Sequence, residues 1–239
     1  GSETLKPLYI EDLSQRTSKI EAAENMPKLL LNSAAAANAV MLGAGYFTPL
    51  KGYMDKNNAM SVAEKMLTEE GLFWPIPIIN LSKSIDGFEI GDEVALLDPN
   101  VEGTPILATQ KISAIEKLAD EEIKFLADKI FGTTELEHPG VANFLSLGNY
   151  LISGTIEVLN FSYFPSEFPG TFATAPEIRA MLAKAGWNTT VAFQTRNPMH
   201  RAHEELCKMA LNRLDADGVL IHMTLGKLKQ GDIPGDVRN

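Results

Sequence analysis

One stretch of the sequence decides the fold of the second half of the chain: Val191-Ala192-Phe193-Gln194-Thr195-Arg196-Asn197-Pro198-Met199-His200-Arg201-Ala202-His203-Glu204. Its apolar first part ends at Thr195, which is typical of a strand over residues 187–195. Asn197 is a good helix N-cap, and Pro198 suits the first helical position because the N–H that proline lacks would be unsatisfied there. The stretch therefore predicts a strand, a sharp turn and a helix over residues 198–214.

The sequence on either side continues this alternation. Thr174 has the position of an N-cap before a helix over residues 175–185, with Pro176 in its first turn and Gly186 at its end. An apolar run over residues 218–223 predicts a second strand. Strands that alternate with helices form a parallel sheet, and ligands bind at the carboxyl ends of its strands.

The first part of the chain has a different pattern. Its short strands and helices predict an α+β, strand-rich, partly barrel-like domain over residues 1–165. The segment 162–170 has two prolines, a glycine and no periodicity, so we place the boundary to a second domain, residues 166–239, within it. In the first domain we expect helices at residues 33–42, 58–69 and 119–131, and strands at 75–81, 93–97, 105–113 and 155–159.

The charge is unevenly distributed along the chain. Of a net charge of −10, residues 1–166 carry −11 (12 Lys and Arg against 23 Asp and Glu), and residues 167–239 carry +1 (9 against 8). An acidic protein is a poor general binder of nucleic acid, and only the second domain is suited to receive an anion. The weakly polar stretch 34–47 is too short to span a bilayer, so we expect a soluble protein with no membrane partner. Cys207, the only cysteine, excludes an intramolecular disulfide and fits the cytoplasm.

The turn after the first predicted strand concentrates groups that bind phosphate. A helix N-terminus offers free N–H groups and partial positive charge. Arg196, His200 and His203 add cationic donors, and the two histidines lie three residues apart on one helix face. Such a set suits the stabilisation of charge on a transferring phosphoryl group. No nucleophile with a neighbouring base stands out, so direct transfer is the expected mechanism.

Each of these residues also has an ordinary structural interpretation. Either histidine alone is compatible with a surface or packing role, and Arg196 is able to pair with Glu204 or Glu205 on the surface. A metal site needs separate consideration, because His200, His203 and Cys207 fall on one helix face and His222 follows on the next strand. No second cysteine and no HExxH pattern is present, so we expect no metal held by the protein alone.

The stretch 193–204 resembles the QxRNPxHxxH signature of the ATP sulfurylases (sulfate adenylyltransferases). The resemblance continues along nearly the whole chain in the order of the family's motifs. Similar segments lie at residues 45–54 (GxFxPLxGFM in the family), 73–77 (FWPIP), 97–99 (LDP), 131–141 (YGT…HPGV) and 226–234, a glycine- and lysine-containing loop before GDIP.

This resemblance implies a fold and a reaction. The first domain would be a PUA-like N-terminal domain, and the second the start of a Rossmann-like nucleotidyltransferase domain of the HIGH superfamily. The implied reaction is in-line attack of sulfate on the α-phosphorus of Mg²⁺-bound ATP, which gives adenosine 5′-phosphosulfate and pyrophosphate and is reversible. The resemblance also implies a homo-oligomer in the cytoplasm.

The resemblance assigns roles to six residues. Gln194 and Arg196 would hold sulfate, Thr195 and Asn197 would orient the phosphates, and His200 and His203 would stabilise the α-phosphate and the departing pyrophosphate. Contacts with ATP would come from Gln194, Thr195, Arg196, Asn197 and His200, and the catalytic set would be Thr195, Arg196, Asn197, His200 and His203.

The chain also departs from the family pattern. Nothing in it matches a second family motif, GRDHAGxG, so we expect an incomplete catalytic domain whose activity alone is doubtful. Two other interpretations stay open: a HIGH-motif nucleotidyltransferase with a different acceptor, and an inactive fragment that serves as an interaction module.

Overall fold

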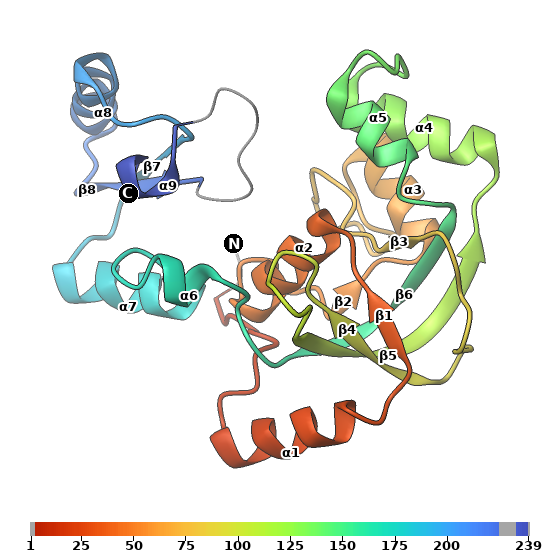
Figure 1. Cartoon of the computed structure of the whole chain (residues 1–239). Coiled ribbons are helices and arrows are strands. Elements are labelled where there is room, and N and C mark those ends of the chain that lie inside the picture. Colours follow the sequence, from red (N-terminus) through yellow and green to blue (C-terminus); the bar gives the residue numbers. More distant parts are fainter. Residues whose placement is uncertain (1–2, 225–232, 239) are drawn as a thin grey trace. The chain divides into compact units, whose positions relative to one another are not determined.

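The computed structural model describes residues 3–224 and 233–238, except the side chains of residues 236 and 238. It divides the chain into two compact units, Gly1–Pro165 and Ser166–Asn239, called here the N-terminal unit and the C-terminal unit (Figure 1). Within the described residues, no helix is long and apolar enough to cross a membrane. Each unit is described by itself.

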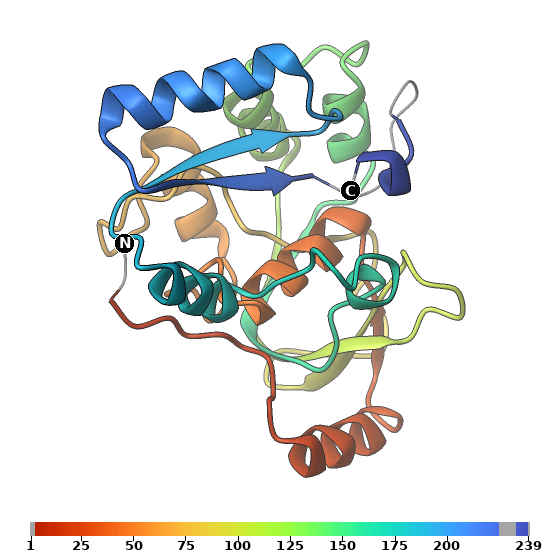
Figure 2. The ribbon, with the colours of Figure 1, turned by 90° about the vertical axis from the view of Figure 1, so that its left-hand side faces the viewer.

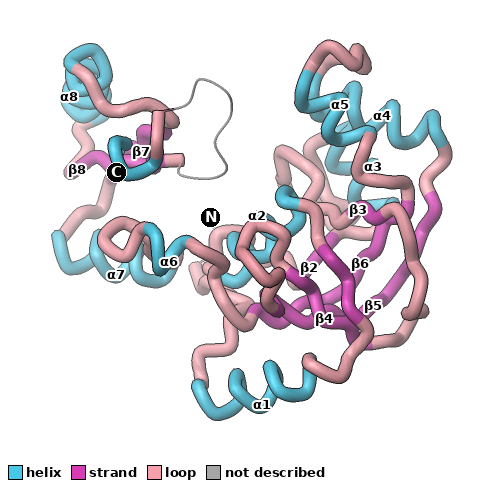
Figure 3. The backbone as a smooth tube through the Cα atoms, viewed as in Figure 1, coloured by secondary structure: helices cyan, strands magenta, loops and turns pink. Residues whose placement is uncertain are grey.

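The N-terminal unit is built on one mixed sheet (Figure 3). Its strands follow the order β1-β4-β5-β6-β2, and β3 also pairs with β6. Pairing is antiparallel except between β1 and β4, which run parallel. The strands are β1 (Lys28–Leu30), β2 (Gly52–Tyr53), β3 (Leu81–Ser82), β4 (Glu93–Leu97), β5 (Ile106–Lys117) and β6 (Tyr150–Val158).

Glycine permits the sharp curvature of this sheet. Gly154 in β6 has a φ of 148°, and a Cβ there would lie 1.9 Å from the carbonyl oxygen of Lys111 in β5. Gly52 in β2 is similarly close to β6, because its Cβ would lie 2.0 Å from the Gly154 oxygen. The register of β5 and β6 also shifts between Ile112 and Ala114, and such bulges bend a strand. The backbones therefore approach at this corner more closely than any side chain would allow.

Helices cover the sheet and complete its core. Alanine at the buried positions of α2 lets this helix lie close to β6, and a Cβ on Gly43 would meet the Val158 side chain at 2.7 Å. The buried Tyr53 hydroxyl donates to the Ala35 carbonyl at 2.8 Å, and burial raises the pKa of that phenol. The helices are α1 (Leu13–Ala23), α2 (Ser33–Gly43), α3 (Lys56–Lys65), α4 (Asp120–Phe131), α5 (Pro139–Leu145) and, across the boundary between the units, α6 (Phe164–Glu167).

The sequence predicted about half of these elements, and it missed α1, α5, α6, β1 and β2. The helices at 33–42 and 119–131 and the strand at 93–97 form as expected, and the strands at 105–113 and 155–159 are parts of the longer β5 and β6. The predicted helix 58–69 ends earlier, at Lys65, because Met66 takes a left-handed conformation with a φ of 55°. The predicted strand 75–81 was wrong except at Leu81, since Pro75 and Pro77 cannot donate to a ladder.

The C-terminal unit has two parallel strands, β7 (Thr190–Thr195) and β8 (Gly218–Met223), joined by α8 (Arg201–Leu214). In Figure 2, α8 runs along the pair of strands. Helix α7 (Ala175–Ala185) precedes them, and α9 (Gly235–Arg238) follows. The prediction for α7 is confirmed: Thr174 caps it, and Gly186 ends it at a φ of 71°. Glu177, which the prediction did not include, completes a capping box with Thr174. The predicted strand 218–223 is confirmed, and the strand expected over 187–195 begins at Thr190.

Candidate functional site

All six predicted site residues lie at one end of the small sheet. Gln194 and Thr195 are the last two residues of β7, and the other four follow before or within the first turn of α8. Because β7 and β8 are parallel, with Gln194 opposite His222 and Thr195 opposite Met223, this end is the carboxyl edge of the sheet. Ligands of open α/β sheets bind at that edge.

The turn after β7 is organised by the hydroxyl of Thr195. This side chain is buried, and its Oγ1 accepts from the Asn197 N–H at 3.0 Å and donates to the Asn197 carbonyl at 3.0 Å. These two hydrogen bonds close a short turn that has Arg196 at its centre. Thr195 therefore fixes the path of the loop from inside, whereas Gln194 and Asn197 are exposed and Arg196 is half-buried.

The predicted start of the following helix was wrong. Helix α8 begins at Arg201, with His200 as its N-cap, and not at Pro198 with Asn197 as its cap. The Asn197 backbone is engaged by Thr195, and a residue before proline disfavours the helical region, so the chain stays non-helical from Asn197 to His200. The imidazole of His200 makes no capping bond to the first turn. The helix N-terminus thus lies beside the histidines, three residues later than expected.

The two histidines are brought together by this geometry. The rings of His200 and His203 stack, with centroids 3.7 Å apart and an interplanar angle of 28°. His203 also contacts the ring of Phe193 in β7, with a centroid distance of 5.5 Å. The Nδ1 atom of His203 is buried and makes no hydrogen bond within the described structure. Burial without a partner is costly for such an atom, so it is a natural position for a ligand or water to contact.

Gln194 projects from the opposite face of β7. Successive side chains of a strand alternate between its faces, so Gln194 lies on the face away from Phe193 and His203. Its exposed Nε2 donates to Oγ1 of Thr224, the residue after β8, at 3.2 Å. Sequence reasoning missed Thr224, since nothing in the sequence indicates that it lies beside Gln194.

The acidic neighbours of the site are paired within α8. Glu204 and Glu205 both lie close to Lys208, with carboxylate oxygens 2.6 and 3.2 Å from Nζ. Hydrogen bonds to Glu204 and then Glu205 raise the pKa of this lysine above its ordinary value. Both carboxylates therefore have a cationic partner other than Arg196.

Within the described residues, no group of three or more His, Cys, Asp and Glu side chains is arranged to hold a metal ion. Cys207 is a free, half-buried thiol. Most of the glycine- and lysine-containing loop at 226–234 lies outside the described residues, which resume at Ile233.

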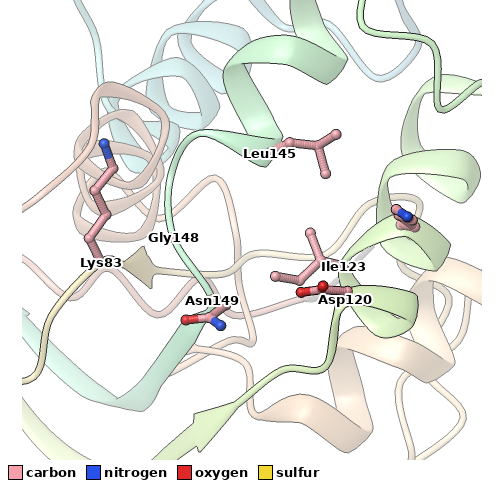
Figure 4. A pocket seen from close by; sticks show the side chains of 7 residues that line it. Lys83, Asp120, Ile123, Leu145, Gly148 and Asn149 are labelled. Atoms are coloured by element: carbon pink, nitrogen blue, oxygen red, sulfur yellow. The ribbon is translucent and has the colours of Figure 1, made fainter.

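A pocket of about 340 Å³ lies elsewhere, in the N-terminal unit (Figure 4). Lys83 and Lys124 line it together with the carboxylate of Asp120, and Ile123 and Leu145 form its apolar part. No residue of the 194–203 segment lines this pocket. The carboxyl edge of β7 and β8, which carries all six predicted residues, is therefore the candidate site.

Two family models match consecutive parts of the chain. The model of the PUA-like domain matches residues 1–161, and the ATP-sulfurylase model matches residues 170–239. The chain belongs to the ATP sulfurylase family. Its family relatives include proteins named sulfate adenylyltransferase from Alcanivorax borkumensis (55% identical), Allochromatium vinosum (50%) and the Riftia pachyptila sulfur-oxidizing endosymbiont (48%), each matched over the whole of this chain.

The chain spans 54–60% of the length of these three relatives. A solved structure, the hexameric APS kinase from Thiobacillus denitrificans, is 25% identical with a TM-score of 0.72, and the match covers 96% of this chain and 40% of that one. The family assignment and the fold class expected from the sequence are both confirmed: a PUA-like, strand-rich domain is followed by the start of an ATP-sulfurylase domain.

Proposed function

We propose that this chain forms part of a sulfate adenylyltransferase, which joins sulfate to the α-phosphate of ATP. A sulfate oxygen attacks the α-phosphorus in line with the departing pyrophosphate; one P–O bond forms, another breaks, and adenosine 5′-phosphosulfate is released. The observation that carries the proposal is the clustering of an arginine, two stacked imidazoles and a helix N-terminus at the carboxyl edge of β7. Four relatives, at 44–55% identity, bear this enzyme's name.

In this proposal Arg196 and Gln194 hold the sulfate. The turn closed by Thr195 presents Arg196 at its apex, and a guanidinium matches a tetrahedral oxyanion through paired N–H donors. Gln194 adds an uncharged donor beside it. Neutralising the sulfate matters because two anions must approach each other for the reaction to occur.

The phosphates of ATP would be oriented by the remaining residues. Thr195 and Asn197 shape the loop, and Asn197 offers an exposed amide. The stacked His200 and His203 lie at the start of α8, where N–H groups and the helix dipole favour negative charge. They would stabilise the charge that grows on the α-phosphate and on the departing pyrophosphate.

Mg²⁺ would enter as part of the ATP complex. The described residues form no carboxylate group for a resident ion, and β- and γ-phosphate oxygens are ordinary Mg²⁺ ligands. The ion would neutralise phosphate charge, and the side chains named above would orient the reacting groups.

We also propose a homo-oligomer in the cytoplasm. The solved relative is a hexameric APS kinase, and the C-terminal unit exposes Leu206, Met209 and Ile221. A lone cysteine fits a reducing compartment. Light scattering during size-exclusion chromatography would measure the assembly, and a monomeric mass would contradict it.

The test of the proposed reaction is ATP formation from adenosine 5′-phosphosulfate and pyrophosphate with Mg²⁺, followed by a coupled luminescent assay. The chain itself and a chain extended to the length of its relatives would be compared. ATP from either supports the proposal, and ATP from the extended chain alone identifies these residues as an incomplete catalytic unit. Absence of ATP from both contradicts it and favours another acceptor, or an interaction module that binds no adenylate.

A further inference from the structure

We propose that Thr224 is a positioning residue that fixes the side-chain amide of Gln194 for the acceptor anion. The inference rests on the proposed function, because it concerns how that site presents one of its donors. It depends on a hydrogen bond of 3.2 Å from Nε2 of Gln194, in β7, to Oγ1 of Thr224, the residue after β8. The two residues are thirty positions apart in the sequence.

The position of Thr224 is fixed by the sheet. Its N–H donates to the Thr195 carbonyl at 2.9 Å, which continues the β7–β8 ladder one residue beyond the end of β8. Gln194 is opposite His222, two positions before Thr224, so Thr224 projects on the same face as Gln194. The hydroxyl is therefore held by backbone bonds at the carboxyl edge, beside the amide.

Gln194 needs such a partner because it is exposed and lies on the face away from His203. An exposed glutamine has several rotamers and two orientations of its amide, one with the nitrogen and one with the oxygen toward a given point. The bond from Nε2 to Oγ1 of Thr224 limits the rotamers of the side chain and holds the amide with its nitrogen toward the hydroxyl. The second N–H of the same nitrogen then remains to donate to an anion at the end of the strand.

The predicted consequence is specific to binding of the acceptor. In the extended chain, Thr224→Val should raise the KM for sulfate about threefold to tenfold, the factor that one ordinary hydrogen bond represents, with kcat changed less than about twofold. Thr224→Ser keeps the hydroxyl and should restore the KM. Thr190→Val, the same change at the opposite end of β7, is the matched control and should have the wild-type KM.

A double-variant cycle separates positioning from a general structural effect. With Gln194→Ala already present, Thr224→Val should change the sulfate KM no further, because its effect passes through the amide. An undiminished effect in that background, or a wild-type KM for Thr224→Val alone, would overturn the inference. Loss of folding is detected separately by the fluorescence of Trp187.

One readout does not depend on activity. In the ¹⁵N spectrum of the chain, the side-chain NH₂ protons of Gln194 should exchange with water faster in Thr224→Val than in wild type, and Thr190→Val should leave them unchanged. If no chain makes ATP, the proposed function fails while this measurement still tests the contact. If ATP forms but neither the KM nor this exchange responds to Thr224→Val, the positioning role fails alone.

Discussion

The two units differ in how many of their side chains are buried in a core. The N-terminal unit has fully buried side chains along the centre of its sheet, among them Leu96, Leu107, Leu151 and Ile152. In the described part of the C-terminal unit, only Phe168, Ala175, Thr195 and Gly218 are buried. The N-terminal unit therefore contains its own core, whereas the C-terminal unit places its proposed chemistry on a sheet edge with little apolar burial beneath it.

This difference implies a separation of roles. Most proposed site residues are exposed or half-buried, so replacing them should impair activity and leave the fold intact. Replacement of core residues in the N-terminal unit should destabilise the fold and leave the proposed site residues unchanged. The two tryptophans report on the two units separately, since Trp74 lies in the first and Trp187 in the second.

The largest expected effect is on the activity of Arg196→Ala. Removal of the guanidinium leaves the acceptor anion unneutralised, so kcat/KM in an active chain should fall by about 10²- to 10³-fold. Thermal unfolding followed by Trp187 fluorescence should be unchanged, because Arg196 is on a surface loop. Arg213→Ala, in the last turn of α8, removes an equal charge and should keep normal activity. Full activity of Arg196→Ala would refute the assigned role.

The next effect is on the stability of the N-terminal unit. Leu151→Ala removes a fully buried side chain from β6 and should lower the free energy of unfolding by about 2–5 kcal/mol. Leu206→Ala on α8, where the side chain is 52% exposed, should cost less than about 0.5 kcal/mol. Chemical denaturation followed at Trp74 and Trp187 measures both variants. Equal losses would show that the two units do not differ as described.

A smaller effect is expected at the start of β8. A Cβ at Gly218 would lie 2.3 Å from the ring of Trp187, so Gly218→Ala should displace the indole and destabilise the C-terminal unit by about 1–3 kcal/mol. The fluorescence maximum of Trp187 should shift, while that of Trp74 stays the same. Gly186→Ala offers a contrast, because no atom lies within 4 Å of its added Cβ and only its φ of 71° opposes the change. An unshifted Trp187 spectrum in Gly218→Ala would contradict the contact.

The smallest effect is an acid sensitivity of the C-terminal unit. The Thr189 and Asn188 N–H groups, which donate to Asp217 Oδ2 at 2.8 and 2.7 Å, lower the pKa of this carboxyl below its ordinary value. A lowered folded-state pKa means that the carboxylate stabilises the fold above the unfolded pKa of about 3.9 and that this contribution is lost as the pH falls further. Melting of wild type should therefore decline below about pH 4 more steeply than that of Asp217→Asn, measured at Trp187. Parallel declines would show that the carboxyl contributes nothing.

Several features followed directly from local sequence. Thr174, Glu177 and Gly186 determine α7 because caps act on the nearest turn of backbone and need no distant partner. The alanine-rich run of α2 and the amphipathic run of α4 also predicted helices, because helix propensity and periodicity are local properties of the sequence. Short edge strands such as β1 and β2 were not predicted, since three or two residues carry no periodicity and depend on a partner strand.

The candidate site likewise has features that the local sequence determined and features that only the tertiary structure decided. The sequence by itself determined which residues gather at the strand-to-helix turn, because Gln194, Arg196, Asn197 and the histidines are neighbours in the chain and resemble one family signature. Only the tertiary structure decided where α8 begins, how the histidines stack, and that Thr224 contacts Gln194. The contact with Thr224 depends on the register of β7 with β8, which is set by hydrogen bonds between residues far apart in the sequence. The start of α8 depends on whether Thr195 or the helix engages the Asn197 backbone, a competition between two local hydrogen-bond patterns that the residue types alone do not decide.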